Sequence, residues 1–307
     1  MNLFVIGNGF DIKHKLPTEY IHFREYLSTE YLGSDEYDEL VPESTIDNHG
    51  EVRFDMADVA GYVSRIIDNC EKGDWSDLES YLGNAIFYSF DMDLETVDMD
   101  APDKDTMRAV YHNESLSSNI RDAFSIIKRL FCDWVNDYLA SLKYEDLRNS
   151  EIAEVIAEGD AFLSFNYTMT LEKVYGVHDV CHIHGMIGDK NDDIIFGHGD
   201  DSEYPESFES LGADYSFNEL KKSLRKDTSR AFYRHKVFFD SLVNVETIHS
   251  FGFSFANVDM FYIEEIARRA PGATWFLNNH TAEQDSAQEI ITKLQELGFE
   301  VKRDNRW

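Results

Sequence analysis

The sequence predicts an α/β protein: a doubly wound parallel sheet with helices on both faces and a large helical insertion. Two observations predict this class. From residue 160 onward, short apolar runs alternate with segments of helical periodicity, and strands separated by single helices form parallel βαβ units. The chain also opens on an apolar run followed by a glycine-rich turn, which begins the same pattern at its other end.

The first element is residues 3–7, an apolar run that ends in Gly7-Asn8-Gly9. It predicts a buried strand that breaks into a tight turn. An amphipathic helix is expected from about Thr18, because four large side chains are spaced to form one face: Tyr20, Phe23, Tyr26 and Leu27.

Residues 34–154 predict a mainly helical, acidic insertion. Three segments have helical periodicity: Val63–Cys70, Leu78–Phe87 and Ser118–Leu142. The stretch from Asp91 to Asp105 carries six Asp and one Glu against one Lys, a composition typical of a solvated loop. A DxD-like pair at Asp91 and Asp93 could bind a hard cation, but we favour the loop.

Residues 155–307 predict the remainder of the sheet and, with residues 1–33, one domain. The strands expected here are Ala161–Phe165, Val180–His184, Ile194–Gly197, Thr247–Phe251, Thr274–Leu277 and Phe299–Lys302. The helices expected between them are Thr168–Tyr175, Arg230–Val243, Val258–Arg268 and Ala282–Leu297. No internal repeat is visible.

The composition is that of a folded, strongly acidic protein. The 307 residues can bury a sizeable core, and 43% are hydrophobic and 14% aromatic. Against 59 acidic residues stand 28 basic ones, a formal charge of −31, so the average surface repels phosphate backbones and anionic lipids. Nucleic acid is therefore not an expected partner.

The cysteines and the N-terminus indicate a reducing, cytoplasmic location. Cys70, Cys132 and Cys181 are widely separated and form no C-x-x-C pair, so neither a disulfide framework nor a zinc ribbon is expected. The opening apolar run is too short for a signal-peptide core, and no stretch approaches transmembrane length. No membrane partner is expected.

The residues that follow the predicted strands are the candidates for chemistry, because open parallel sheets bind ligands outside the carboxyl ends of their strands. After the first strand come Gly7, Asn8, Gly9, Phe10 and Asp11. Glycines allow the backbone to approach a ligand, and exposed N–H groups there can cradle a phosphate. A tight turn after any strand also favours glycine, and the third glycine of the dinucleotide fingerprint is missing.

Two further strand ends carry Asn166 with Thr168, and His182-Ile183-His184-Gly185. Asn166 is expected to project into the crevice while Thr168 caps the next helix. Alternation along a strand would place His182 and His184 on one side, and a neutral His184 beside Gly185 could act as a general base.

Alternative roles for these residues remain. A strand-end Asn is often a turn former, and a buried His is often only satisfied by hydrogen bonds. With His198, these histidines could also form part of a metal site. No metal is expected, since no carboxylate or cysteine falls at recognisable ligand spacing.

Later strand ends offer Gly252-Phe253-Ser254-Phe255, with Asp259 opening a helix, and Asn278-Asn279-His280. Each is ordinary by itself. Together, nearly every strand of the predicted sheet ends in Gly, Asn, Ser or His, which favours a polar crevice over a packed edge.

These motifs resemble those of the AbiH abortive-infection family of bacterial phage-defence proteins. The resemblance rests on the GNGFD turn at Gly7–Asp11 with Leu16-Pro17-Thr18, and on motifs that follow in order along the chain. These are Phe165-Asn166-Tyr167-Thr168 with Leu171-Glu172, Ile183-His184-Gly185, Phe196-Gly197-His198-Gly199, Gly252–Asp259, and a weaker Trp75 and Glu79.

Through that family the chain also resembles, more distantly, the Rossmann-like NAD-binding domains of the Sir2 type. The resemblance implies that Gly7 and Gly9 hold phosphate, that Asn166 orients water or the ribose, and that His184 is the base. It further implies a cofactor site that includes Asn8, Phe10, Asp11, Thr168, Gly185, Gly252, Ser254 and Asn278. Sirtuins keep an acid two residues after the Asn, where this chain has Thr168, and deacylases carry four zinc cysteines that it lacks, so deacylation is disfavoured.

The resemblance implies an anti-phage effector that hydrolyses NAD at the nicotinamide–ribose bond. The alternative is a non-catalytic module that senses a nucleotide, and Thr168 in place of an acid mildly favours it. A metal-dependent toxin directed at nucleic acid is a third hypothesis, which the charge of −31 disfavours. The expected partner is a small nucleotide, and self-association or a defence-system partner is left open.

Overall fold

A computed structural model describes residues 1–34, 41–70, 75–84, 86–91, 94–204, 211–278, 281 and 287–304. The chain divides into two compact units. Unit 1 comprises Met1–Glu19, Val135–Ile195 and Asp227–Trp307, and unit 2 comprises Tyr20–Trp134 and Phe196–Lys226. The chain therefore leaves unit 1 twice and returns to it twice.

Unit 1 is built on a six-stranded sheet in the order β5-β4-β1-β6-β7-β8, in which all neighbours pair in parallel. The strands are β1 (Asn2–Ile6), β4 (Ala161–Ser164), β5 (Cys181–His182), β6 (Thr247–Phe251), β7 (Thr274–Asn278) and β8 (Glu300–Asp304). Strand order reverses at β1, as in doubly wound dinucleotide-binding sheets. The predicted Rossmann-like α/β fold is confirmed, and its switch point lies between β1 and β6.

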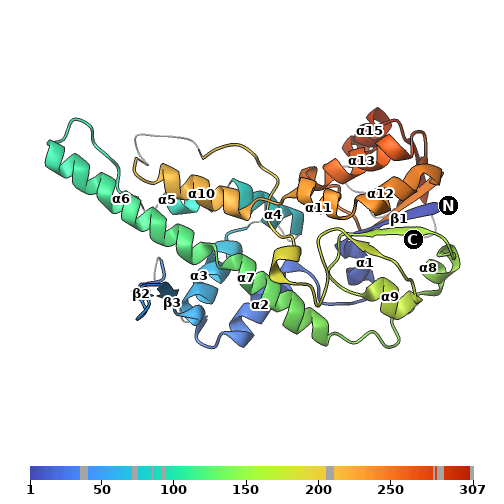
Figure 1. The fold of residues 1–307 in the computed structure, drawn as a ribbon, viewed down its shortest axis with the longest axis horizontal. Helices are drawn as coiled ribbons and strands as arrows, with labels where there is room; N and C mark the ends of the chain where they lie inside the picture. The colour runs from blue at the N-terminus through green and yellow to red at the C-terminus, as the bar shows by residue number, and fades with distance from the viewer. Residues whose placement is uncertain are drawn as a thin grey trace. The chain divides into compact units, whose positions relative to one another are not determined.

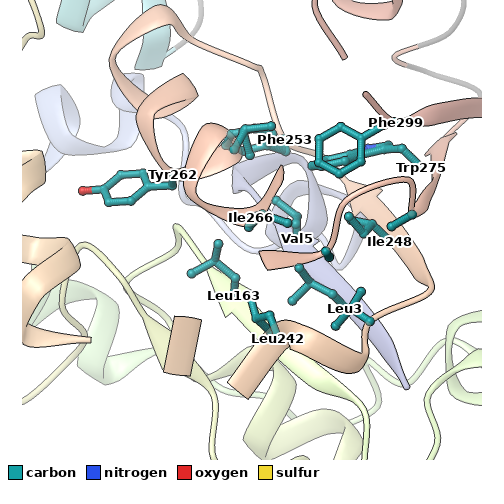
Figure 2. Close-up of a cluster of buried hydrophobic side chains, with 14 of the residues drawn as sticks. Leu3, Val5, Leu163, Leu242, Ile248, Phe253, Tyr262, Ile266, Trp275 and Phe299 are labelled. Atoms are coloured by element: carbon teal, nitrogen blue, oxygen red, sulfur yellow. The ribbon is translucent and has the colours of Figure 1, made fainter. Parts of the chain in front are cut away.

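The two faces of β1 enter two separate cores. Leu3 and Val5 join a cluster with residues of β4, β6 and β7, part of which Figure 2 shows. Phe4 and Ile6 join a second cluster on the opposite face. Both faces are apolar because a central parallel strand is covered on each side.

Helices cover each face of the sheet, and Figure 1 labels them. On the Phe4 side lie α1 (Asn8–Lys13), α8 (Ser150–Val155) and α9 (Thr170–Tyr175), which contribute Phe10, Ile152 and Leu171 to the core. On the Leu3 side lie α11 (Thr228–Arg234), α12 (Lys236–Asp240), α13 (Met260–Arg269) and α15 (Ala287–Glu296), which contribute residues such as Phe232, Phe239, Ile263 and Leu294.

Local signals fix where these helices begin and end. The Asn149 side chain accepts from the backbone N–H groups of Glu151 and Ile152 and so caps α8. Helix α9 ends at Gly176, whose φ of 69° is the left-handed conformation that favours glycine at a helix C-terminus. Helix α11 begins after Asp227, whose carboxylate accepts from Arg230 N.

Unit 2 is mainly helical. It contains α2 (Tyr20–Glu30), α3 (Met56–Asp68), α4 (Trp75–Gly83), α5 (Ile86–Asp91), α6 (Asp103–Phe124), α7 (Ile127–Asp133), α10 (Asp214–Leu224) and the antiparallel hairpin β2 (Ser44–Ile46) and β3 (Val52–Phe54). Aromatic side chains fill its core: the rings of Phe131 and Phe196 stack 4.2 Å apart, and Trp75 and Trp134 pack beside them. In the part of the chain that the structure describes, no helix combines the length and apolarity needed to span a bilayer.

Several predicted elements differ from the structure. The predicted strand Ile194–Gly197 is wrong: a 3-10 turn at Asn191–Asp193 precedes it, and Ile195 N makes a single bond to the His184 carbonyl at 2.8 Å. Its apolar side chains are buried by separate units, since Ile195 packs in unit 1 and Phe196 in unit 2. The hairpin β2–β3 and helix α10 were not predicted.

The two compact units also divide the chain differently from the predicted domains 1–33 with 155–307 and 34–154. Helix α2 belongs to unit 2, where Phe23 packs on Phe131. Residues 135–154 belong to unit 1, where Ile152 joins the core beside Phe4. Residues 196–226 form a second excursion that the polar character of this stretch did not reveal.

Two predicted features lie wholly or partly outside the described residues. Asp93 is not described, nor is the side chain of Asp91, so the candidate cation pair is not placed. The same holds for Asn279 and His280 and for the first turn of the predicted helix Ala282–Leu297.

Candidate functional site

Three glycines bring the loops after β1 and β6 together at the switch point. Gly9 N donates to Gly252 O at 3.0 Å. A Cβ atom on Gly7 would lie 2.4 Å from Gly252 O, and one on Gly252, whose φ is 62°, would lie 2.3 Å from Phe10 N. The two loops are therefore in direct backbone contact, and only glycine fits at these positions.

This contact uses N–H groups that were candidates for holding phosphate. Gly7 N donates to Phe251 O at 3.0 Å, and Phe10 N donates to Gly7 O at 2.9 Å. With Gly9 N bound to Gly252, three N–H groups of the turn are used inside the protein. The role of Gly7 and Gly9 in binding phosphate stays a prediction, and these bonds do not support it.

Asp11 lies on α1 directly beyond this turn and is buried. Its carboxylate accepts hydrogen bonds from the Thr168 and Thr170 hydroxyls, both at 2.6 Å. Burial raises the pKa of Asp11 to about 6, although the two threonine hydrogen bonds act to lower it. At neutral pH the group is an ionised, buried carboxylate that two hydroxyls hold in place.

The Sir2-like pattern carries an acid at the position that Thr168 occupies in this chain. Here Asp11 supplies an acid beside Thr168. The two residues come from α1 and from the segment after β4, which neighbour each other because β1 and β4 pair. Thr168 was expected to cap a helix, but no side-chain cap is formed at α9, which begins at Thr170. Its hydroxyl donates to Asp11 instead.

Asn166 is buried and ties the end of β4 to the turn after β1. Its side-chain Nδ2 donates to Gly7 O at 3.0 Å. In the register of the sheet Ser164 pairs with His182, so Asn166 and His184 each stand two residues beyond a matched pair. The two candidate catalytic residues thus occupy equivalent positions on neighbouring strand ends.

His184 faces a carboxylate within a cage of aromatic rings. Its Nε2 lies 3.2 Å from Asp259 Oδ1, and the two side chains are 4% and 8% exposed. The rings of Phe165 and Tyr262 lie 5.2 and 6.1 Å from the imidazole between centroids. Gly185, with a φ of 85°, turns the chain away; a Cβ there would lie 2.6 Å from Asp193 O. A buried imidazole that faces a carboxylate is a common arrangement for a general base.

The prediction that His182 and His184 share one side of the strand is wrong. His182 binds the Asn166 carbonyl through Nδ1 and Glu172 of α9 through Nε2, both at 2.8 Å, on the Phe4 side of the sheet. His184 instead faces Asp259, which immediately precedes α13, on the other side. Alternation fails because β5 ends at His182 and the chain turns there.

Glu172 sets the charge state of His182. Burial alone would lower the pKa of His182, but the hydrogen bond and charge of Glu172, with smaller contributions from the Asn166 carbonyl and Asp11, raise it. His182 thus joins Asp11 and Glu172 in one buried polar group beside Asn166.

The remaining predicted residues lie at the same edge of the sheet. Ser254 is exposed on the loop after β6, between the buried rings of Phe253 and Phe255, and Phe255 has a left-handed φ of 56°. Asn278 is buried at the end of β7, where its Oδ1 accepts from Thr281 N at 2.9 Å. Asn8 is half-buried on α1.

Phe10 is a core residue. Its ring is 1% exposed and packs edge-on against Phe251 with centroids 5.3 Å apart. Its predicted contact with a cofactor stays untested, and its packing alone accounts for an aromatic residue at this position.

The unit 2 motif residues have partners of their own. His198 is buried, with Nε2 2.9 Å from Lys221 O and Nδ1 accepting from Asp200 N at 3.1 Å. Glu79 pairs with the buried Lys226 at 2.6 Å. Within the described ranges, no group of three or more His, Cys, Asp or Glu residues could hold a metal ion.

Four residues that sequence reasoning did not place in the site are Thr170, Glu172, Asp259 and Tyr262. Glu172 and Asp259 were visible as motif positions, but nothing in the sequence paired Glu172 with His182 or Asp259 with His184. Tyr262 carried no signal beyond the apolar periodicity of its helix.

Comparison with known families decides the relationship. The family described as "Bacteriophage abortive infection AbiH" matches residues 3–279, most of the chain. The chain belongs to the AbiH family. No curated protein and no solved structure matches it. Membership indicates a role in bacteriophage abortive infection and confirms the resemblance found in the sequence.

Proposed function

We propose that this AbiH protein acts in abortive infection by hydrolysing NAD at the nicotinamide–ribose bond. The observation that carries the proposal is the placement of Asn166 and His184 at equivalent positions beyond Ser164 and His182. Both stand at the carboxyl edge of a sheet with the strand order of dinucleotide-binding proteins, the edge at which such sheets bind ligands. NAD as the substrate comes from the distant Sir2-like resemblance.

The reaction needs few groups from the protein. The C1′–N bond breaks with its electron pair left on nicotinamide, which departs neutral, and a water oxygen forms the new bond to C1′. The water proton passes to His184. Because the transition state resembles an oxocarbenium ion, the protein accelerates the reaction by orienting the ribose and water and by stabilising charge.

Asp259 suits the role of partner to His184. Its carboxylate oxygen, 3.2 Å from Nε2, stabilises the imidazolium that forms when His184 accepts the proton. The aromatic rings beside the imidazole lower the local dielectric constant, which strengthens this interaction. Asn166, whose Nδ2 binds Gly7 O, presents its side-chain oxygen as an acceptor for the ribose or water.

The test is incubation of the purified protein with NAD, with nicotinamide release followed by chromatography. His184→Ala and Asn166→Ala should abolish release while the proteins stay folded. His178→Ala is the matched control, because His178 is an exposed histidine in the same unit. Unchanged NAD loss in both variants, in vitro and during phage infection, would contradict the proposal.

The second candidate function is a module that binds a nucleotide without cleaving it. The observation that favours it is Thr168, which stands where the Sir2-like pattern carries an acid and whose hydroxyl donates to Asp11 at 2.6 Å. Calorimetry separates the two functions: NAD binding without nicotinamide release supports the sensor, and binding with release supports the hydrolase.

A further inference from the structure

The hydroxyl of Tyr262 stands out among the buried polar groups near His184. Tyr262 is 0% exposed, and its hydroxyl has no hydrogen-bond partner among the described residues. Leaving a buried hydroxyl unpaired costs free energy, and native proteins rarely retain such a group without a reason. Binding of a ligand by the group is one such reason.

The position of Tyr262 ties this hydroxyl to His184. Tyr262 lies in α13, one helical turn after Asp259, and its ring is 6.1 Å from the His184 ring. The ring is held by Phe165 and Phe239, with centroids 5.7 and 6.3 Å away. In Figure 2 the hydroxyl lies on the side away from the other labelled core side chains. Because packing fixes the ring, the position of the hydroxyl oxygen is fixed before a ligand binds.

The surrounding charges indicate what the hydroxyl would bind. Asp259 is an acceptor, and at neutral pH its carboxylate repels a phosphate. The nearby cation Arg234 is committed, since it donates to Asp193 Oδ1 at 2.7 Å and to the Asp193 carbonyl at 3.0 Å. A hydroxyl that can donate and accept, carried on a ring 6.1 Å from the imidazole that faces this carboxylate, matches neutral hydroxyl groups rather than an anion.

We infer that Tyr262, with Asp259 and His184, forms a subsite for the hydroxyl groups of a ribose ring, and that Tyr262 is a ligand-binding residue of this protein. The inference deepens the proposed NAD hydrolysis and rests on it for the identity of the ribose. It places a sugar, and not a phosphate, against the β5 and β6 loops. The Tyr262 hydroxyl gains its partner when ligand binds.

The first arm of the test is the stability of the protein without ligand. Tyr262→Phe removes a hydroxyl that has no partner to lose, so its melting temperature should equal or exceed that of the wild type. Tyr175→Phe is the matched control, because the Tyr175 hydroxyl bonds His14 Nε2 at 2.5 Å and accepts from Asn149 N at 3.2 Å. The control should lower the melting temperature. A comparable fall for Tyr262→Phe would overturn the inference.

The second arm is calorimetric binding of NAD and of an NAD analogue that lacks one hydroxyl of the nicotinamide ribose. Tyr262→Phe should weaken NAD binding by about tenfold, the equivalent of one good hydrogen bond. If Tyr262 contacts a ribose hydroxyl, the analogue that lacks that hydroxyl will bind the wild type and Tyr262→Phe equally. The hydrogen bond is absent from both of these complexes. Equal NAD affinity of the two proteins would overturn the inference.

These outcomes separate the inference from the proposed function. NAD binding that depends on Tyr262, with no nicotinamide release, would support the subsite and contradict hydrolysis. Release that is unaffected by Tyr262→Phe, with NAD affinity also unchanged, would support hydrolysis and overturn the subsite. A wild-type protein that binds neither NAD nor ADP-ribose would overturn both.

Discussion

Two histidine-glycine pairs stand in the two units of this protein, and the structure uses them differently. His184-Gly185 in unit 1 presents its imidazole to the side-chain carboxylate of Asp259. His198-Gly199 in unit 2 has both ring nitrogens engaged by the backbone, at Lys221 O and Asp200 N. Both imidazoles are equally buried.

Burial and motif do not distinguish the two histidines, whereas the type of partner does. Under the proposed function, His184 is the catalytic histidine and His198 is structural. A backbone carbonyl and an N–H group satisfy an imidazole in one tautomer and give it no acid to exchange protons with. A carboxylate favours the protonated form that a general base must reach. Four predictions test this contrast between the two units.

The largest effect is expected from His184→Ala. General bases contribute about 10²–10⁴-fold to rate, so nicotinamide release should fall by that factor. The melting temperature should also fall, because the substitution leaves the buried Asp259 carboxylate without its imidazole partner, so release is compared per folded molecule. Release within threefold of the wild type would show that His184 is structural, like His198.

Asp11 in unit 1 and Asp200 in unit 2 should contribute stability with opposite dependence on pH. The pKa of Asp11 is raised to about 6 by burial, so the unfolded chain releases this proton at lower pH than the folded one. The stability that the protonated group contributes is lost as pH rises from about 4 to 6, by up to roughly 3 kcal/mol. Asp11→Asn should remove this loss, as measured by urea unfolding from pH 4 to 7.

Asp200 in unit 2 is the control for that experiment. Burial acts to raise its pKa, but bonds from Ser202 and Lys221 lower it overall. Its contribution to stability is therefore present above the ordinary aspartate pKa and is lost as pH falls. If the free energy of unfolding fell as steeply with rising pH in Asp11→Asn as in the wild type, the assignment of this loss to Asp11 would be contradicted.

His198→Ala should act on stability alone. Its loss leaves the Lys221 carbonyl and Asp200 N–H unpaired in a buried site, at a cost of about 2 kcal/mol. We expect a lower urea midpoint in chemical unfolding and unchanged nicotinamide release per folded molecule. Loss of release in a folded His198→Ala protein would end the contrast between the two histidines.

The smallest effect is expected from Glu172→Gln. The raised pKa of His182, which Glu172 causes against the opposing effect of burial, contributes stability that is full below the ordinary histidine pKa and is lost as pH rises above it. The variant should therefore lose about 1 kcal/mol at pH 5.5 and less at pH 8.5. An equal loss at both pH values would show that His182 is neutral in the folded protein.

Much of the sheet could be predicted because its strands are short apolar runs bounded by glycine or polar residues. Five of the six strands after the first were placed near their observed positions, and the exception, Ile194–Gly197, was apolar because the side chains of Ile195 and Phe196 are buried in different units. Helix α10 was not predicted because its many polar residues hide the helical spacing of its buried side chains, Phe217 and Leu220. Sequence periodicity does not report which unit buries a residue.

The site was predictable at the level of strand ends but not of contacts. Asn166 and His184 were chosen as candidates because both follow strands, and the register places them at equivalent positions on neighbouring strand ends. The pairing of His184 with Asp259 and of Thr168 with Asp11 joins residues far apart in the sequence, and the order of strands in the sheet decides it. The side on which His184 lies depended on the turn after His182, where β5 ends, and alternation ignores such a turn.

The central place of β1 has a consequence for synthesis. This strand is synthesised well before its neighbours β4 and β6, which begin only at Ala161 and Thr247. At ~5–20 residues per second, β1 stays without its second neighbour for on the order of 10–50 seconds. A translation product that stops before Thr247 carries Asn166 and His184 but neither Gly252 nor Asp259. An interrupted round of translation therefore releases no assembled site into the cell that made it.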